Sequence, residues 1–419
     1  MLKTAERNIR QAASSLGISD NELALILKPN KIHKVKIVVG DREYDGYRIQ
    51  HSNKLGPYKG GIRFHHEVHL EEVQALATLM SFKTSAVGLP LGGGKGGVIV
   101  DVSEHDLESL EKIARGYVRE LHKHIGPDID IPAPDVNTNS QIIDWMTDEY
   151  EILTGEKSKA SFTGKSLSNR GCWGREEATG RGGVIALREY LKRIGKDPKT
   201  TTIAVQGLGN VGYYFSKIAH DEYGMKIVAV SNSKKTILCD KGFDFSQQTY
   251  SRQAIDSLEK QKTSKKLAPE KILEQKVDVL VCAALADAIV FKNADSINAK
   301  IILELANGPV DYRSHEKMTK DGKVIIPDII ANAGGVIVSY YEWLQNKKDE
   351  TWELDKVRNE LDEILSKAMK ETMDYSEKTG LSLKQSAFEI AIQNLRKDPE
   401  AAEAIVEEIQ EELAEEAVS

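Results

Sequence analysis

The chain has 419 residues, of which 29% are charged, with a net charge of −7 and a pI of about 5.9. This length exceeds one ordinary hydrophobic core and predicts two or three globular domains. No Lys/Arg run is interleaved with aromatic residues, which disfavours nucleic acid as a partner. The sequence also has no apolar signal core and no run of about 18 apolar residues, so we expect a cytoplasmic protein with no membrane partner.

The first part of the chain predicts a mixture of helices and strands. An amphipathic segment at residues 1–17 predicts a helix, and alternating patterns at 31–39 and 43–52 predict two strands. Apolar residues at helical spacing predict another helix over 70–83. We therefore expect an α/β first domain over residues 1–182.

From residue 183 onwards, short apolar strands are separated by helical segments. This rhythm predicts a parallel, doubly wound sheet over 183–335. Residues 336–419 are helical in pattern and should pack back on the first domain. Their acidic tail, 398–419, is expected to be a solvated helix or a contact with another protein. The expected strands of the sheet lie at 201–206, 226–230, 278–283, 300–306 and 323–328, with a long polar helical stretch between the second and the third.

Residues 88–97 read GLPLGGGKGG and place Lys95 among five glycines, on an expected turn. Glycines permit close approach of backbone and substrate, and a lysine withdrawn from water has a lowered pKa. A phosphate-binding P-loop is rejected, because Leu89 and Gly96 stand where that motif needs Gly and Ser or Thr. The segment predicts a catalytic lysine, with a solvated glycine-rich turn as the alternative.

Gly207, Gly209 and Gly212 directly follow an expected strand and fill the pattern G-x-G-x-x-G. In this context the motif predicts a pyrophosphate site at a helix N-terminus. After the next strand, at the position that an NAD enzyme usually gives to a carboxylate, the chain has Asn232 followed by Lys234 and Lys235. This favours NADP, with NAD left open.

Lys59, Lys83, Lys95 and Asp135 are the candidates for proton transfer and substrate binding in the first domain. Three lysines would repel one another unless anionic groups lay between them, which suggests a dicarboxylate substrate. Surface lysines and a turn-capping aspartate are the alternatives.

His65, His66 and His69 resemble a metal cluster, but the sequence supplies no partner set that would complete a zinc site, and we expect no metal. Cys172, Cys239 and Cys282 are few and widely spaced, which argues against a disulfide framework.

Seven segments in register resemble the glutamate dehydrogenase family, which includes the Leu, Phe and Val dehydrogenases. The resemblance covers residues 20 to 395, through GPYKGGIRF, PLGGGKGG, PAPDVNT, GREEATGRG, GLGNVG, ELANGP and PDIIANAGGVIVSYYEW. It implies a substrate-binding and oligomerisation domain at 1–182 and a Rossmann-type dinucleotide-binding domain at 183–335, with the remaining helices returning to the first domain.

The resemblance also implies roles for individual residues. Lys95 would be the catalytic lysine and Asp135 the acid/base. The substrate ligands implied are Lys59 and Ser339, with Val336, for the side-chain carboxylate, and Lys83, Arg175 and Asn332 for the main-chain carboxylate. The cofactor ligands implied are Thr179 and Asn307 for the nicotinamide and its ribose, and Gly207, Gly209, Asn210, Val211 and Gly212 for the pyrophosphate. Asn232 and Lys234 are added as candidates for the adenosine ribose from their place after the next strand, where Asn232 departs from the usual Asp.

The activity implied is reversible oxidative deamination of L-glutamate to 2-oxoglutarate and ammonium by a homohexamer with NADP or NAD. A dehydrogenase for leucine or phenylalanine is the nearest alternative, but a cationic Lys59 does not suit an apolar side chain. A non-catalytic regulatory homologue is the other alternative, and the presence together of Lys95, Asp135 and Arg175 argues against it.

Overall fold

The computed structural model describes residues 2–251, 253–261 and 265–396, so the predicted acidic tail at 398–419 lies outside the described residues. Within them the chain forms two compact units. A seven-stranded unit comprises residues 2–15, Gly174–Gly335 and Arg358–Glu389, and a five-stranded unit comprises Leu16–Trp173, Val336–Val357 and residues 390–396. The chain passes repeatedly from one unit to the other, whereas the sequence patterns led us to expect contiguous domains with boundaries at 182 and 335.

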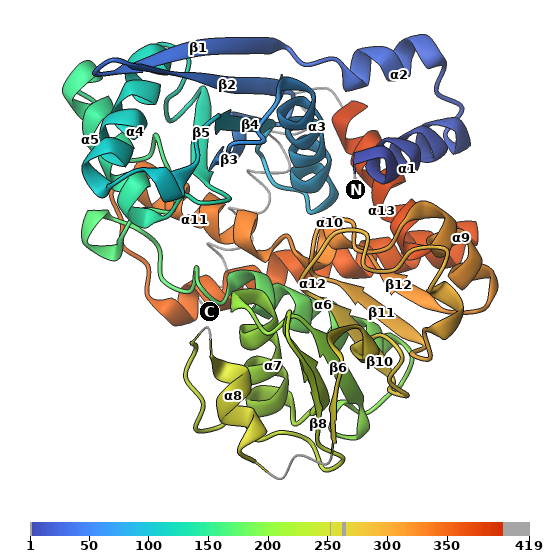
Figure 1. Ribbon diagram of the computed structural model, residues 1–419. Coiled ribbons are helices and arrows are strands. Elements are labelled where there is room, and N and C mark those ends of the chain that lie inside the picture. The colour runs from blue at the N-terminus through green and yellow to red at the C-terminus, as the bar shows by residue number, and fades with distance from the viewer. Residues whose placement is uncertain (1, 252, 262–264, 397–419) are drawn as a thin grey trace, which may run out of the picture. The chain divides into compact units, whose positions relative to one another are not determined.

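The sheet of the five-stranded unit has the order β1-β2-β4-β3-β5 (Figure 1). The antiparallel pair β1–β2 matches the two predicted strands, whereas the other three strands were not predicted. β3 runs parallel to both β4 and β5. The bounds are β1 Lys31–Val39, β2 Arg42–Ser52, β3 Tyr58–Phe64, β4 Gly93–Val98 and β5 Asp130–Pro134.

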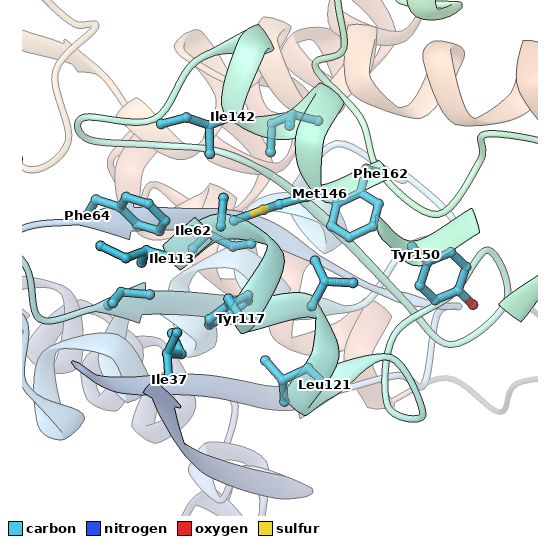
Figure 2. Close-up of a cluster of buried hydrophobic side chains, with 14 of the residues drawn as sticks. Ile37, Ile62, Phe64, Ile113, Tyr117, Leu121, Ile142, Met146, Tyr150 and Phe162 are labelled. Atoms are coloured by element: carbon cyan, nitrogen blue, oxygen red, sulfur yellow. The ribbon is translucent and has the colours of Figure 1, made fainter. Parts of the chain in front are cut away.

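Helices cover both faces of this sheet. On one face, a large apolar core joins the strands to α4 (Leu107–Leu121) and α5 (Ser140–Thr154). Figure 2 shows Ile62 and Phe64 of β3 in this core with Tyr117 of α4. On the other face, α3 (Leu70–Ala86) packs Val73 and Ala77 against Ile49 of β2.

Because side chains alternate along a strand, this packing assigns Ile62–Phe64 of β3 and the residues of β4 to faces. Ile62 and Phe64 face α4 and α5 with the even-numbered residues of β4, so Arg63 faces α3 with the odd-numbered residues of β4. Two glycines show how tight the packing is. A Cβ at Gly93 would lie 2.2 Å from the Ser81 backbone nitrogen of α3, and a Cβ at Gly96 would lie 2.3 Å from the Tyr117 hydroxyl.

The sheet of the seven-stranded unit has the order β12-β11-β10-β6-β7-β8-β9. Its first five members are parallel and match the five predicted strands. The bounds are β6 Thr202–Gln206, β7 Lys226–Ser231, β8 Thr236–Leu238, β9 Lys265–Leu267, β10 Val279–Cys282, β11 Ile301–Glu304 and β12 Val324–Ile326.

The prediction of one long polar helix after β7 was wrong. This stretch contains β8, the six-residue helix α8 (Ala254–Glu259) and β9, and its two strands pair antiparallel at the edge of the sheet. Thr236 and Ile237 are buried, so even a three-residue strand here contributes apolar packing.

Helices complete both units. Arg188 of α6 donates two hydrogen bonds to the Asp362 carboxylate of α12, at 2.5 and 2.8 Å, within the seven-stranded unit. No helix among the described residues is long and apolar enough to cross a membrane. The remaining helices are α1 Leu2–Ser15, α2 Asp20–Leu27, α6 Ala178–Arg193, α7 Asn210–Tyr223, α9 Tyr312–Lys320, α10 Asp328–Ala331, α11 Gly334–Lys347, α12 Leu354–Thr379 and α13 Leu383–Arg396, with 3-10 turns at Val102–Glu104, Leu167–Asn169, Pro198–Thr200, Pro269–Ile272 and Ala294–Ser296.

Candidate active site

Charged side chains gather on the face of the five-stranded sheet that α3 covers. Lys59 and Arg63 are odd-numbered residues of β3, Lys95 is an odd-numbered residue of β4, and Asp135 directly follows β5. Lys95 therefore lies inside a strand, and the expected turn at this position was wrong. The glycines around it make room for α3 and for neighbouring strands, whereas we had expected them to make room for a substrate.

Lys95 and Asp135 form the centre of this group. The Lys95 Nζ lies 3.0 Å from Asp135 Oδ1, and the lysine side chain is 8% exposed. Burial lowers the pKa of Lys95, and the positive charges of Arg63 and Arg48 lower it further, while Asp135 opposes the shift. Burial would raise the pKa of the Asp135 carboxyl, but Lys95 and Arg63 hold it well below its usual range. The pair thus combines an amine that loses its proton more easily with a carboxylate that stays ionised.

Arg63 is a member of the site that the sequence analysis missed. Its Nε donates to Asp135 Oδ2 at 2.8 Å, and its Nη1 donates to Glu72 Oε1 of α3 at 2.6 Å. Both oxygens of Asp135 are therefore bound to cations, and Arg63 is itself held by Glu72. The alternation of Lys59, Gly61 and Arg63 in a strand was the signal that could have revealed it.

Lys59 is buried, with only 1% of the residue exposed. Its Nζ donates to the backbone carbonyl of Ile131 at 3.1 Å, across the β3–β5 pair. This bond orients the ammonium group. A buried lysine at this position suits an anionic ligand, because an anion stabilises a buried cation.

The structure also places Lys83, Val336 and Ser339 in the five-stranded unit. Lys83 is half-buried on α3, next to Phe82 and Thr84, which are buried. Ser339 is buried in α11, and Val336 lies one turn before it. This helix is anchored one turn later by Glu342, whose carboxylate accepts hydrogen bonds from the Gly164 backbone at 2.8 Å and from Lys165 Nζ at 2.7 Å.

In the seven-stranded unit, the predicted dinucleotide loop lies between β6 and α7, as the motif requires. Gly207 has a φ of +87°, which strains any residue with a side chain. A Cβ at Gly212 would lie 1.9 Å from the Gly207 carbonyl oxygen, so close packing requires this glycine. Gly209 has no described atom within 4 Å of its Cβ position, which leaves the N-terminus of α7, with Asn210 and Val211, open to an anion. These residues fit a dinucleotide pyrophosphate.

The turn after β7 differs in one respect from our expectation. Asn232 Oδ1 accepts hydrogen bonds from the backbone nitrogens of Lys234 and Lys235, so it shapes the turn. Lys234 is exposed, but the Nζ of Lys235 is bound by the carboxylates of Asp256 and Glu259. The sequence analysis had counted both lysines as available to a 2′-phosphate.

Asn332, at the C-terminus of α10, hydrogen-bonds to two groups of the ELANGP loop. Its Nδ2 donates to the Leu305 carbonyl at 3.2 Å and to Asn307 Oδ1 at 3.0 Å. Its own Oδ1 is buried without a hydrogen-bond partner among the described residues. Thr179 lies in the first turn of α6, and Arg175 lies in the turn before it. The four predicted ligands Arg175, Thr179, Asn307 and Asn332 therefore belong to the same unit as the glycine loop.

Two of the three histidines considered as metal ligands come together with a residue that we had not considered. Side-chain atoms of His65, His66 and Glu67 lie within 4.8 Å of one another. His66 and Glu67 are exposed, and His65 Nδ1 already accepts a hydrogen bond from the Glu67 backbone. His69 lies 3.8 Å from Glu72 instead.

Comparison with known families agrees with this arrangement. The Glutamate/Leucine/Phenylalanine/Valine dehydrogenase family matches residues 171–402, and the dimerisation domain of the Glu/Leu/Phe/Val dehydrogenases matches residues 29–152. The chain belongs to this family. The first of these matches contains the glycine loop at 207–212, and the second contains the Lys95–Asp135 pair.

Similar proteins are glutamate dehydrogenases. The chain is 39% identical to the glutamate dehydrogenase of Thermotoga maritima over 94% of its own length and 95% of the relative. It is 37% identical to the NAD-specific glutamate dehydrogenase of Peptoniphilus asaccharolyticus over 94% and 96%. The crystal structure of the Peptoniphilus asaccharolyticus enzyme matches with a TM-score of 0.84 over 96% of this chain and 98% of that one, at 36% identity. A hetero-hexameric glutamate dehydrogenase of Thermus thermophilus, with Leu bound, also matches with a TM-score of 0.84 at 29% identity, over 94% of each chain.

Proposed function

We propose that the protein is a glutamate dehydrogenase, which catalyses the reversible oxidative deamination of L-glutamate to 2-oxoglutarate and ammonium. The observation that carries this proposal is the buried Lys95–Asp135 pair, with Nζ and Oδ1 3.0 Å apart, on a sheet face that also presents the buried cation Lys59. A buried amine with a lowered pKa, held beside an ionised carboxylate, is equipped for proton transfer.

A bound nicotinamide would supply the acceptor for the hydride that leaves the α-carbon of glutamate, which would convert the substrate to an imino acid. Water then adds to the imine carbon and ammonia leaves, which forms the keto group. In this scheme the neutral amine of Lys95 takes a proton from the attacking water, and the Asp135 carboxylate exchanges protons with the substrate nitrogen. The hydride carries the two electrons, so the later steps need no oxidant. They form the C–O bonds of the keto group from water and break the C–N bond as ammonia leaves, with protons moved by Lys95 and Asp135.

The substrate class follows from charge. Lys59 and Ser339 are proposed to bind the side-chain carboxylate of glutamate beside Val336, and Lys83, Arg175 and Asn332 are proposed to hold the main-chain carboxylate. A leucine or phenylalanine side chain would leave the buried ammonium of Lys59 facing an apolar group, which is costly. This argument favours a dicarboxylate over an apolar amino acid.

NADP is the favoured cofactor, with NAD as the alternative. Thr179 and Asn307 are proposed to contact the nicotinamide and its ribose, and Gly207 and Gly209 the pyrophosphate. The preference for NADP rests on Asn232, which replaces the usual carboxylate, and on the exposed Lys234 in the same turn. One relative, from Peptoniphilus asaccharolyticus, is named as NAD-specific, and this supports NAD as the alternative.

A homohexamer is proposed as the assembly, since the Thermus relative is a hexamer, although of two chain types. β1 supports association of some kind. It is a nine-residue strand at the edge of its sheet, with Val38 63% exposed, and such edges tend to pair. A cytoplasmic location stays a prediction of the sequence.

Initial rates test the proposal. Purified protein should oxidise NADPH, and more slowly NADH, when 2-oxoglutarate and ammonium are both present. Lys95→Ala should abolish turnover, whereas Lys59→Met should raise the KM for 2-oxoglutarate and improve the relative rate with the keto acid of leucine. Faster turnover of an apolar keto acid by the unmodified protein would favour the alternative substrate class. No turnover with either cofactor, in protein that binds one, would favour a regulatory homologue.

A further inference from the structure

The two lysines of the turn between β7 and β8 have different surroundings. The turn is closed by a hydrogen bond from the Asn232 nitrogen to the Lys235 carbonyl at 3.0 Å, and Asn232 Oδ1 accepts from the Lys234 and Lys235 nitrogens at 2.9 and 3.0 Å. This network fixes the backbone from which both side chains start. Lys234 is exposed, whereas the side chain of Lys235 is only 13% exposed.

Two carboxylates of α8 bind the Lys235 ammonium group. Its Nζ donates to Asp256 Oδ1 at 2.6 Å and also to Glu259 Oε2. Glu259 is held in place by a second lysine, because Lys266 Nζ of β9 donates to its other oxygen at 2.8 Å. These hydrogen bonds raise the pKa of Lys235, and Lys235 with Lys266 lowers the pKa of Glu259. Figure 1 shows α8 and β8 in the same part of the seven-stranded unit.

The turn lies beside the glycine loop. The Ser231 carbonyl, at the end of β7, accepts hydrogen bonds from the backbone nitrogens of Gly207 at 3.1 Å and Leu208 at 2.9 Å. In dinucleotide-binding folds, the residue that meets the ribose 2′ group follows the glycine motif by roughly 20 residues, at the end of the next strand. Asn232 occupies that position, and Lys235 is three residues further along the same turn.

We propose that Asp256 and Glu259 withhold Lys235 from the 2′-phosphate of NADP, so that α8 limits how strongly this turn binds that group. The inference rests on the proposed function, because it takes the glycine loop as the dinucleotide site. Lys234 then supplies the attraction for the 2′-phosphate. The carboxylates of Asp256 and Glu259 neutralise the ammonium group of Lys235, and they add negative charge near the dianionic 2′-phosphate.

The test measures binding and needs no turnover. Adenosine 2′,5′-bisphosphate and ADP are titrated by calorimetry into the full-length protein and its variants. Neutralising the clamp with Asp256→Asn/Glu259→Gln should tighten binding of the 2′,5′-bisphosphate about tenfold, or about 1.4 kcal/mol. ADP, which lacks the 2′-phosphate, should bind as before. Glu274→Gln is the matched control, since it breaks the Lys271–Glu274 ion pair elsewhere in the same unit.

Removing Lys235 separates its role from that of the carboxylates. Lys235→Met alone leaves Asp256 and Glu259 without the cation they share, so it should weaken binding of the 2′,5′-bisphosphate modestly. Adding it to Asp256→Asn/Glu259→Gln should remove most of the gain, because the released lysine carries it. A gain of the same size in the triple variant would overturn the inference. Normal ADP binding with no gain refutes this inference alone, whereas failure to bind either nucleotide refutes the dinucleotide site as well.

Discussion

Arg63→Met should shift the pH dependence of catalysis. Arg63 and Lys95 bind opposite oxygens of the Asp135 carboxylate, at 2.8 and 3.0 Å, so their positive charges lie close together. At an effective dielectric constant of about 20, two like charges roughly 5 Å apart repel by about 3 kcal/mol. Arg63 is 15% exposed, and water screens part of this repulsion.

The direction of the pH shift follows from the proposed mechanism, in which the neutral amine of Lys95 is the active form. Arg63 lowers the pKa of Lys95, so its removal raises that pKa and reduces the neutral fraction of the amine at a given pH. After allowance for screening, we expect the acidic limb of the kcat/KM profile for glutamate to move up by about one pH unit, which is a tenfold loss on that limb. Arg63→Lys should recover part of the shift, because it restores the charge without the second hydrogen bond to Glu72.

The assay is kcat/KM for glutamate from pH 5.5 to 10, with circular dichroism to verify folding. Arg119→Met is the matched control, since it makes the same substitution at an exposed arginine that pairs with Glu149 in the same unit. A folded Arg63→Met enzyme whose profile overlays that of the unmodified protein would refute the electrostatic argument. An equal loss of rate at all pH values would also refute it. Such a loss would mean that the substitution misplaces Asp135 and leaves the pKa of Lys95 unchanged.

Three further results are expected. Gly212→Ala should destabilise the protein and abolish nucleotide binding, because its Cβ would lie 1.9 Å from the Gly207 carbonyl oxygen. Gly209→Ala should leave the melting temperature unchanged and lower the affinity measured in a nucleotide titration. Lys384→Met should lower the free energy of unfolding by about 3–5 kcal/mol, because it removes the lysine that pairs with the buried Glu304 carboxylate. Adding Glu304→Gln should restore part of this stability. Equal melting temperatures for the unmodified protein and both variants would contradict the prediction. The depressed pKa of Asp135 contributes stability above its unfolded pKa of about 3.9 that is lost as the pH falls further, so Asp135→Asn should flatten the acid side of the unfolding curve measured with denaturant.

The sequence predicted strands best where apolar and β-branched residues dominate. β1 begins and ends at the predicted residues 31 and 39, and all five parallel strands of the larger sheet were found. β4 was missed because its sequence, GGKGGV, has one β-branched residue and reads as a turn. β8 and β9 were missed because strands of three residues are too short to show an alternation of apolar and polar residues.

The sequence selected candidate site residues but gave no sign of the charges that surround them. The resemblance selected Lys59, Lys95 and Asp135, and the structure brings Lys95 and Asp135 within 3.0 Å. Arg63 escaped notice because it was read as part of a motif centred on Lys59. Lys235 was counted as available because its carboxylate partners lie more than 20 residues away in sequence, where no local pattern announces an ion pair.

The division of the chain between the two units has a consequence for protein synthesis. Residues 2–15 and Arg358–Glu389 belong to the same unit, with Arg7 stacked 3.8 Å above the Tyr312 ring of α9. A ribosome adds about 5–20 residues per second, so α1 waits roughly 20 seconds or longer for its last partners to emerge. During that time the residues of α1 that are buried in the folded unit, such as Ile9 and Ala12, stay exposed to water.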